Sequence, residues 1–339
     1  MKEGGDSIII KKMKIAGAKG KAKRAIKAVA HYLGCSESEL SAERQGLGYS
    51  NIVFKVSSEN NSYLYKEYLS DITLDSFELK WQKHFERPKV LFETSKYRID
   101  EYIEHRVMTK SSLKNPEVLK GIAKQLSAMH STKTPPGANV YYANLLKDQK
   151  NKVASKISSI RFFEICKKIE KKIETLCSNS IFKNSLKVCH NDLQFGNILL
   201  LPTNEVVIID FEHVSLNIPS IDIAGFFNEA CTNYRQRGAP LAEKHFLHTE
   251  YAKIFLKAYL KEQGISAPVN KVLKEIEKVR SVSHYYWFVW AIAMLVKEKK
   301  QASLDYFAFA MNRLRYLQQD DFITSTNVKE LRRFIANRK

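Results

Sequence analysis

Two short stretches near the middle of the chain carry the polar residues that decide the fold. Residues 190–197 read His-Asn-Asp-Leu-Gln-Phe-Gly-Asn, and residues 208–212 read Ile-Ile-Asp-Phe-Glu. Short apolar segments with turn residues between them flank both stretches and are predicted to be strands, at residues 186–189, 198–201 and 206–210. The polar residues of both stretches therefore lie at or beyond the ends of short strands.

Asp192, Asn197 and Asp210 place oxygen-bearing side chains in a characteristic order. Asn197 follows Asp192 by five residues on one loop, and Asp210 stands at the end of an apolar strand. Phosphoryl transfer needs a carboxylate that takes the proton of the attacking hydroxyl, and Mg²⁺ held by carboxylate and amide oxygens. Each residue alone is typical of a turn cap or a buried polar group, but together they predict a base at Asp192 and metal ligands at Asn197 and Asp210.

At these residues the sequence resembles the choline/ethanolamine kinase family, which shares the protein-kinase-like fold of the aminoglycoside phosphotransferases. Residues 190–197 look like the HNDxxxxN catalytic loop of that family, and residues 209–212 look like its IDFEY motif. The resemblance extends from about residue 43 to 318. It includes a hinge at residues 98–106, a helix with Asp222 and Glu229, a tryptophan segment at residues 283–290 and a final helix at residues 306–314.

The resemblance implies a choline kinase that transfers the γ-phosphate of ATP to the choline hydroxyl, with Mg²⁺ as cofactor. The products are phosphocholine and ADP, at the first step of phosphatidylcholine synthesis by the CDP-choline route. In this family the residue matching Asp192 is the catalytic base, and those matching Asn197 and Asp210 bind Mg²⁺. Glu212 is expected to support the metal or its loop, and His190 is expected to hold the catalytic loop in place.

A glycine-containing turn is predicted to contact the nucleotide phosphates through backbone N–H groups. Its candidate residues are Gly46, Gly48, Ser50 and Asn51. Taken alone, such a pattern is typical of a plain hairpin turn, but it precedes a strand with a basic residue.

Lys66, in a later strand, is expected to hold the α- and β-phosphates and counts among the catalytic residues. Relatives often have Arg at this position. Glu78 on the following helix is the expected ion-pair partner of Lys66. Adenine is expected to bind along the backbone of Glu101, Tyr102 and Ile103.

Aromatic residues at helical spacing are the candidates for binding a quaternary ammonium group, which aromatic faces and nearby carboxylates can hold. Trp287 and Trp290 are three residues apart and share one helix face, and Tyr306 and Phe309 repeat that spacing on the next helix. Such a stripe alone is typical of a helix core. The match to the choline pocket of the family favours substrate binding.

Two residues of the motifs bear on the choice of acceptor. Gln194 follows the choline kinase pattern HNDLQ, and Phe211 gives IDFE, whereas ethanolamine kinases more often have IDYE. His213 departs from the family, because relatives usually carry an aromatic Tyr there that contributes to the pocket. Phe309 keeps the ring but lacks the hydroxyl of the Tyr that is common in relatives.

The element order predicts an α+β, bilobal, protein-kinase-like fold. Residues 1–20 are expected to be a flexible basic N-terminus, residues 21–103 a nucleotide-binding lobe, and residues 104–339 a catalytic and choline-binding lobe. The first lobe is expected to hold a helix at 21–33, strands at 52–56, 62–68, 90–92 and 97–103, and a helix at 74–85. The second is expected to be mainly helical, with helices at 116–130 and from 153 to 176.

Composition limits the compartment and the partners. Fifty-five basic and 36 acidic residues give a net charge of +19, which a lysine-rich solvated surface can explain. Five cysteines without CxxC spacing argue against disulfides and zinc and favour a cytoplasmic protein. The most apolar run, residues 285–296, is shorter than the roughly 20 residues that span a bilayer. We expect no nucleic acid and no integral membrane contact; weak surface association and a homodimer stay open.

Three alternatives remain at this point. The N-terminal basic helix, residues 21–33, is expected to pack on the first lobe, although such a helix can also lie on a membrane. Ethanolamine, both amino alcohols, or an aminoglycoside are alternative acceptors; aminoglycosides call for many acidic side chains, which the C-terminal helices lack. A non-catalytic basic binding protein is the alternative from another class, and the intact set of polar residues argues against it.

Overall fold

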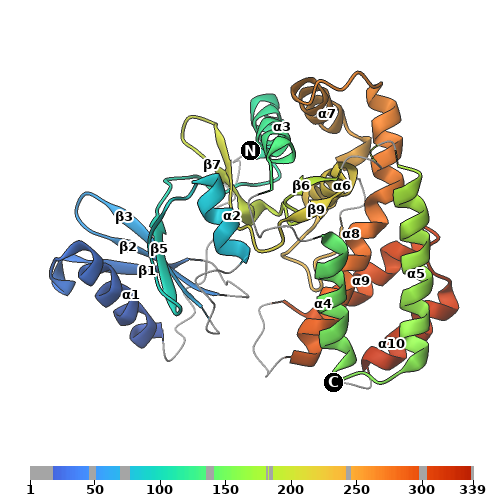
Figure 1. Cartoon of the computed structure of the whole chain (residues 1–339), viewed down its shortest axis with the longest axis horizontal. Helices are drawn as coiled ribbons and strands as arrows, with labels where there is room; N and C mark the ends of the chain where they lie inside the picture. The colour runs from blue at the N-terminus through green and yellow to red at the C-terminus, as the bar shows by residue number, and fades with distance from the viewer. Residues whose placement is uncertain are drawn as a thin grey trace, which may run out of the picture. The chain divides into compact units, whose positions relative to one another are not determined.

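The computed structural model describes residues 18–45, 51–68, 77–134, 141–180, 182, 186–241, 246–297 and 304–336. The chain divides into two compact units (Figure 1). Unit 1 contains residues 1–74 and 88–102, and unit 2 contains residues 75–87 and 103–339. The helix expected at residues 74–85 in the first lobe is therefore grouped with the second unit.

Unit 1 is built on a five-stranded antiparallel sheet with the strand order β1-β2-β3-β5-β4. The strands are β1 (Ser41–Gln45), β2 (Asn51–Ser57), β3 (Ser62–Tyr68), β4 (Val90–Glu93) and β5 (Tyr97–Glu101), and a 3₁₀ turn at Glu37–Glu39 precedes them. Along β2 every second residue is buried, at Ile52, Phe54 and Val56. This alternation puts the three side chains on one face of the sheet.

Helix α1 (Ala18–Leu33) covers that apolar face (Figure 1). Ala25 and Val29 are fully buried against the sheet, and Arg24 forms an ion pair with Glu67 at 2.7 Å. The expectation that this helix packs on the first lobe is confirmed. The helix begins three residues earlier than expected, within the stretch predicted to be a flexible N-terminus, and residues 1–17 lie outside the described residues.

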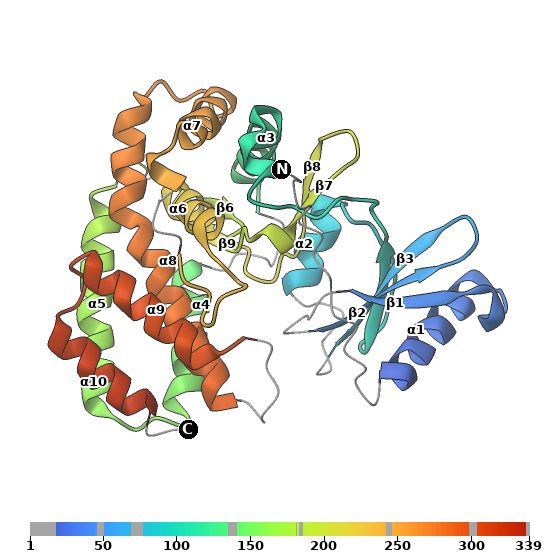
Figure 2. The same cartoon turned by 180° about the vertical axis from the view of Figure 1, so that it is seen from behind.

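Unit 2 is mainly helical, as expected, with two small strand pairs (Figure 2). Its helices are α2 (Phe77–Phe85), α3 (Pro116–Ser131), α4 (Tyr142–Ala154), α5 (Ile160–Ser178), α6 (Pro219–Cys231), α7 (Glu250–Glu262), α8 (Val269–Lys297), α9 (Tyr306–Gln319) and α10 (Ser325–Ala336). Short 3₁₀ turns lie at Ser112–Lys114, Phe195–Asn197 and Phe246–His248. The strand pairs are β6 (Lys187–Cys189) with β9 (Ser215–Asn217), and β7 (Ile198–Leu200) with β8 (Val206–Ile208).

Helix α6 lies at the centre of unit 2. Nearly all of its residues are buried, and it packs against α8 and β6. A helix that is largely apolar around its whole circumference needs such an enclosed position. Its first turn is therefore a fixed support for the loop that follows β6.

Helix α2 packs on an aromatic cluster of unit 2. Trp81 is fully buried, and the ring of Phe85 lies 4.7 Å from that of Phe211, between ring centroids. Val188 and Val214 complete the cluster. These contacts are the physical reason why α2 belongs with unit 2.

Two sequence predictions of secondary structure are wrong in unit 2. The single helix expected from residue 153 to residue 176 is two helices, because the chain turns at residues 155–159. Ser159 caps the second helix, where its side chain accepts a hydrogen bond from the Phe162 N–H. Strand β9 was not expected, because its three residues are too few to show the alternation of apolar and polar residues that is typical of a strand.

The apolar run at residues 285–296 forms part of α8, whose inner residues are buried in unit 2. Among the residues that the structure describes, no helix combines the length and apolar character that crossing a membrane requires.

Candidate active site

The loop after β6 carries the first polar stretch and is held by Asn191. Asn191 has a φ of 65°, a left-handed conformation that Asn tolerates better than most residues. Its Nδ2 donates to the carbonyl oxygens of Cys189 at 3.0 Å and His213 at 2.9 Å, and its Oδ1 accepts from Asn217 at 2.8 Å. These bonds fix the loop to the segment that includes β9.

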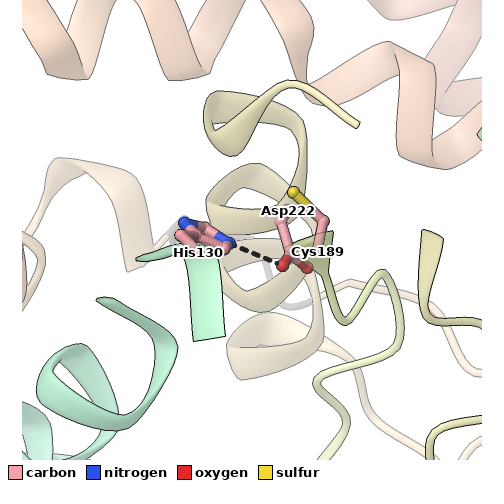
Figure 3. A group of neighbouring side chains, drawn as sticks. All are labelled: His130, Cys189 and Asp222. Atoms are coloured by element: carbon pink, nitrogen blue, oxygen red, sulfur yellow. Dashed lines mark hydrogen bonds and ion pairs between the residues drawn. The ribbon is translucent and has the colours of Figure 1, made fainter. Parts of the chain in front are cut away.

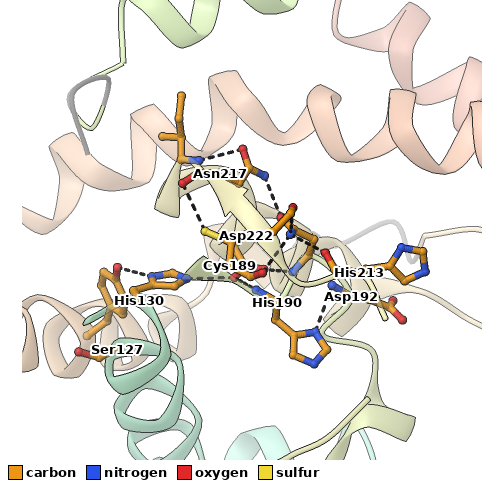
Figure 4. Close-up of polar contacts among 12 residues, drawn as sticks. Ser127, His130, Cys189, His190, Asp192, His213, Asn217 and Asp222 are labelled. Atoms are coloured by element: carbon orange, nitrogen blue, oxygen red, sulfur yellow. Dashed lines mark hydrogen bonds and ion pairs between the residues drawn. The ribbon is translucent and has the colours of Figure 1, made fainter. Parts of the chain in front are cut away.

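Asp222, in the first turn of α6, holds the same loop from the other side (Figure 4). Its carboxylate accepts from the backbone N–H groups of His190 and Asn191, both at 2.8 Å. It also accepts from His130 Nε2 at 3.0 Å. Burial alone raises the pKa of Asp222, but the hydrogen bond and charge of His130 outweigh burial and leave the pKa below its ordinary value.

His130 extends this contact to α7. Its Nδ1 shares a hydrogen bond of 2.6 Å with the hydroxyl of Tyr259, and the His130 side chain is fully buried. The loop with Asp192 is therefore supported by three helices, α6 through Asp222, α3 through His130 and α7 through Tyr259.

His130, Cys189 and Asp222 also have the composition of a small metal site (Figure 3). Their ligand atoms lie within 4.8 Å of one another. However, Asp222 already accepts three N–H bonds, and burial raises the pKa of the Cys189 thiol well above its ordinary value. Because a metal binds thiolate rather than thiol, this cluster is better explained as a support for the loop.

Asp192 is held by two side-chain amides. Asn197 Nδ2 donates to its Oδ2 at 2.9 Å and to its backbone oxygen at 2.8 Å, and Gln194 Nε2 donates to its Oδ2 at 3.2 Å. The Asp192 N–H donates to His190 Nδ1 at 3.3 Å, so His190 Nε2–H donates to the carbonyl of Ile209 at 2.9 Å. His190 therefore links the loop to the backbone of Ile209, and its role as a support of the loop stays a prediction.

The surroundings of Asp192 shift its acidity. Burial raises its pKa to about 7, and the negative charges of Glu229, Asp210 and Glu212 add to this effect, while His213 opposes it. A carboxylate with a pKa near neutrality is suited to take a proton from an alcohol during catalysis.

The predicted metal ligands come from two adjoining segments. The Ile209 N–H donates to the carbonyl of Asn197 at 3.0 Å, which places Asp210 next to that residue. Asp210 has a φ of 70° and follows β8 by two residues. Because Nδ2 of Asn197 donates to Asp192, Oδ1 is the amide atom suited to coordinate a cation. With the carboxylates of Asp210 and Glu212, this gives the hard oxygen donors that Mg²⁺ prefers, so the residues fit the ion.

His213 lies between Glu212 and the aromatic residues of α8. Its Nδ1 is 2.9 Å from the hydroxyl of Tyr286, and its Nε2 is 3.5 Å from Glu212 Oε1. Burial lowers its pKa, but the hydrogen bond and charge of Glu212 outweigh burial and raise the pKa to about 9. The ring lies 5.3 Å from that of Trp287.

The predicted acceptor residues form one aromatic cluster. Trp287 and Trp290 meet edge to face with centroids 5.3 Å apart. Trp290 in turn contacts Tyr306 at 5.4 Å and Phe309 at 6.2 Å. The pairing of α8 with α9 thus joins the four residues, and His213 extends the cluster toward the metal ligands.

Three further residues next to this cluster were not predicted to bind substrate. Glu229 is buried, accepts from the hydroxyl of Tyr234 at 2.6 Å, and lies 3.6 Å from Arg313 Nη2. The guanidinium carbon of Arg313 lies 4.4 Å from the ring centroid of Phe309. Burial raises the pKa of Glu229, and Arg313 opposes this. The sequence could have pointed to Glu229 and Arg313, because both lie in segments that resemble the family. Nothing in the sequence singled out Tyr234.

The predicted nucleotide residues lie on both units. Lys66 on β3 is buried and pairs in register with Arg98 on β5. Tyr65 packs with α1, so Lys66 points to the opposite face of the sheet. Glu78 belongs to unit 2, and its ion pair with Lys66 stays a prediction.

The other nucleotide candidates are placed as follows. Asn51 begins β2, Glu101 ends β5, and Tyr102 follows it at the end of unit 1. Ile103 begins the main segment of unit 2 and contacts the β7–β8 residues Leu199, Leu201 and Val207. Gly46, Gly48 and Ser50 lie outside the described residues.

Known proteins resemble this chain in sequence and fold. A sequence profile described as choline/ethanolamine kinase matches residues 44–318. The Arabidopsis thaliana protein named "Probable choline kinase 2" is 28% identical over 243 residues, which are 68% of this chain and 67% of that protein. The crystal structure of choline kinase from Cryptosporidium parvum Iowa II matches with a TM-score of 0.69 at 21% identity, over 94% of this chain and 98% of that chain. A Plasmodium vivax ethanolamine kinase matches with a TM-score of 0.67 at 21% identity, over 84% of this chain and 83% of that chain. The kinase-like fold predicted from the sequence is confirmed.

Proposed function

Because this chain belongs to the choline/ethanolamine kinase family, an ATP-dependent group of phosphotransferases, we propose that it phosphorylates choline. The observation that carries the proposal is the position of Asp192. Gln194 and Asn197 hold its carboxylate, and the backbone of Asn197 is hydrogen-bonded to Ile209, the residue before Asp210. The pKa of Asp192 is raised to about 7. Asp192, Asn197 and Asp210 thus offer a base and metal ligands, and the loop that carries Asp192 is held in place by α3, α6 and α7.

In the proposed reaction, Asp192 accepts the proton of the acceptor hydroxyl as its oxygen attacks the γ-phosphorus of ATP. The bond from that phosphorus to the bridging oxygen breaks, and ADP leaves. Asn197, Asp210 and Glu212 would hold Mg²⁺, which when bound neutralises charge on the phosphate oxygens. Gln194 and Asn197 orient the carboxylate of Asp192 by donating hydrogen bonds to one of its oxygens.

The aromatic cluster supports a cationic acceptor. Trp287 and Trp290 offer ring faces and edges on α8, and the buried carboxylate of Glu229 is linked to Phe309 of the same cluster through Arg313. A quaternary ammonium group cannot donate an N–H bond, so ring faces and a nearby negative charge are the interactions open to it. Choline fits this chemistry.

Ethanolamine is the second candidate, and His213 favours it. A histidine with a raised pKa places positive charge 5.3 Å from the ring of Trp287, which disfavours a second cation at that ring. The primary ammonium of ethanolamine has three N–H groups and can bind carboxylates directly. Relatives and matching structures carry names of both kinds.

A substrate panel tests the proposal. Purified protein with Mg²⁺ and ATP is given choline, ethanolamine or an aminoglycoside, and the phosphorylated product is identified by ³¹P NMR. We expect phosphocholine to form with the highest kcat/KM. A higher kcat/KM for ethanolamine would move the assignment to the second candidate, and absence of product from both amino alcohols would overturn the proposal.

A further inference from the structure

The segment after α6 forms a compact loop of ten residues, Thr232 to Leu241, whose two ends meet. Thr232 and Leu241 form an isolated antiparallel bridge, and the Asn233 N–H donates to the carbonyl of Pro240 at 2.8 Å. Inside the loop, the Asn233 side chain accepts from the Arg235 N–H at 3.1 Å. The loop therefore has a defined internal structure and is expected to move as a single unit.

This loop lies along one stripe of α9. Arg237 donates to Asp305 at 2.6 Å, Asn312 donates to the carbonyl of Gly238 at 2.9 Å, and the hydroxyl of Tyr316 accepts from the Leu241 N–H at 2.6 Å. Positions 305, 312 and 316 share one face of a helix. The acceptor candidate Phe309 lies on the same stripe, four residues after Asp305 and three before Asn312, and Tyr306 lies on the neighbouring stripe.

Gly238 is the point of closest approach between the loop and α9. It has a φ of 72°, and a Cβ built there would lie 2.5 Å from the carbonyl carbon of Ala308 and 2.7 Å from its Cβ. A backbone atom of a helix cannot move aside as the end of a side chain can. Any residue with a Cβ must therefore push the loop away from α9.

The loop connects Tyr234 to the acceptor candidate Phe309 through Glu229 and Arg313. The Tyr234 hydroxyl donates to the buried carboxylate of Glu229 at 2.6 Å, while its ring is half-exposed. Glu229 lies 3.6 Å from Arg313, which stacks on the ring of Phe309. A shift of the loop therefore moves Tyr234 and removes its hydrogen bond to Glu229, the carboxylate next to Arg313.

We propose that Gly238 is a positioning residue for the acceptor, because it lets the loop pack on α9 and so fixes Tyr234 against Glu229. Gly238 itself touches no substrate. The inference rests on the proposed function, since it assigns the acceptor to the cluster that contains Phe309. Gly238 is expected to affect the affinity for the amino alcohol and not the affinity for ATP.

The test compares Gly238→Ala with Gly264→Ala. Gly264 follows α7, has a φ of 63°, and has no atom within 4 Å of a built Cβ, so it reproduces the backbone strain without the collision. We expect Gly238→Ala to raise the KM for choline about tenfold while the KM for ATP stays within about twofold. Gly264→Ala is expected to leave both KM values unchanged. Choline binding, followed by the fluorescence of Trp287 and Trp290, should weaken in parallel with the KM.

A milder pair keeps the test valid if Gly238→Ala does not fold. Asn312→Ala removes one hydrogen bond to the loop, and Gln319→Ala alters an exposed residue of the same helix. Asn312→Ala should raise the choline KM several-fold, and Gln319→Ala should leave it unchanged.

The outcomes distinguish a failure of the proposed function from a failure of the role proposed for Gly238. If the wild-type protein phosphorylates neither choline nor ethanolamine, the proposed function fails. If the wild-type protein is active, but Gly238→Ala and Asn312→Ala change both KM values together or change neither, the role of Gly238 is overturned. Lower thermal stability with unchanged kinetics would also overturn it.

Discussion

At the scale of single residues, the hydrogen bonds around Asp192 set both its direction and its acidity. Two amides donate to one carboxylate oxygen, and the backbone of the loop is fixed on both sides. Neither amide donates to the other oxygen, Oδ1, which is the atom suited to take a proton. Removing the charge while keeping the shape should therefore affect chemistry more than binding.

Asp192→Asn keeps the size of the side chain but removes the base. We expect kcat to fall by about 10²–10⁴-fold, the range typical of a lost general base. ATP affinity, measured by equilibrium binding, should change little. An Asp192→Asn protein that retains most of the wild-type kcat would exclude Asp192 as the base.

The raised pKa of Asp192 predicts the acid side of the pH profile. Because the folded protein holds this carboxyl with a pKa of about 7, the base is protonated and inactive below that pH. The kcat/KM for the acceptor should rise as the pH increases through about 7. In Glu229→Gln, loss of a nearby negative charge should move this rise to lower pH. An unshifted rise in the variant would contradict the electrostatic explanation.

Trp287 is the residue-scale test of the acceptor cluster. Trp287→Ala removes a ring that contacts both His213 and Trp290. We expect the KM for choline to increase more than the KM for ATP, because cation–π contacts act on the ammonium group alone. Steady-state kinetics with each substrate varied in turn provides the measurement, and equal increases would remove Trp287 from the acceptor site.

Order and spacing of residues made part of the site predictable. Asp192, Asn197 and Asp210 lie within 19 residues of sequence, and their pattern is local. Asp222, His130 and Tyr259 support the same loop from helices far away in sequence, so no local pattern could reveal their joint role. Sequence reasoning can therefore propose the reactive groups more readily than the residues that hold them.

At the scale of secondary-structure elements, α3, α6 and α7 meet at one hydrogen-bonded chain. His130 joins Asp222 on α6 to Tyr259 on α7, and all three side chains are buried. A buried carboxylate that loses a partner is costly, because water cannot replace the missing bond. The support of the catalytic loop is therefore also part of the core of unit 2.

His130→Ala should weaken both stability and turnover. We expect the free energy of unfolding to fall by about 2–4 kcal/mol, because a cavity forms and a buried carboxylate loses a donor. His31→Ala, at an exposed position of α1, is the control and should stay within about 0.5 kcal/mol of wild type. Urea unfolding and kcat provide the readouts. A stable variant with wild-type kcat would show that His130 does not support the loop.

The break between α4 and α5 gives a second prediction for an element. Ser159→Ala removes the side-chain acceptor for the Phe162 N–H and should lower stability by about 1 kcal/mol. Ser158→Ala alters the exposed neighbour and should have little effect. Equal unfolding midpoints for Ser159→Ala and wild type would contradict the capping role.

Helix and strand patterns explain which elements were predictable. The expected strands of unit 1 match β2 to β5 closely, since alternating burial gives a clear period along β2. The break before α5 was hidden because Val153 and Ile157 are both buried, so the apolar spacing continues through the turn. Strand β9 pairs with β6, which is far away in sequence, so the local alternation of apolar and polar residues could not reveal this pairing.

At the scale of the whole molecule, the resemblance in sequence and the two-unit organisation agree. The sequence resembled the family from about residue 43 to 318, and the family profile matches residues 44–318. The catalytic loop, the metal-ligand candidates and the aromatic cluster all lie in unit 2, while Lys66 lies in unit 1. The sequence favours choline through Gln194 and Phe211, and this choice over ethanolamine stays a prediction, because His213 belongs to an aromatic cluster built from several elements.

The central claim is that Asp192, Asn197 and Asp210 direct the γ-phosphoryl group of ATP onto an amino alcohol. Rapid-quench single turnover with excess enzyme, Mg²⁺, γ-³²P-labelled ATP and choline or ethanolamine tests this claim most directly. We predict that the label moves to the amino alcohol with wild-type protein, and that it stays in ATP with Asp192→Asn. Label released only as inorganic phosphate, or equal transfer by both proteins, would contradict the account.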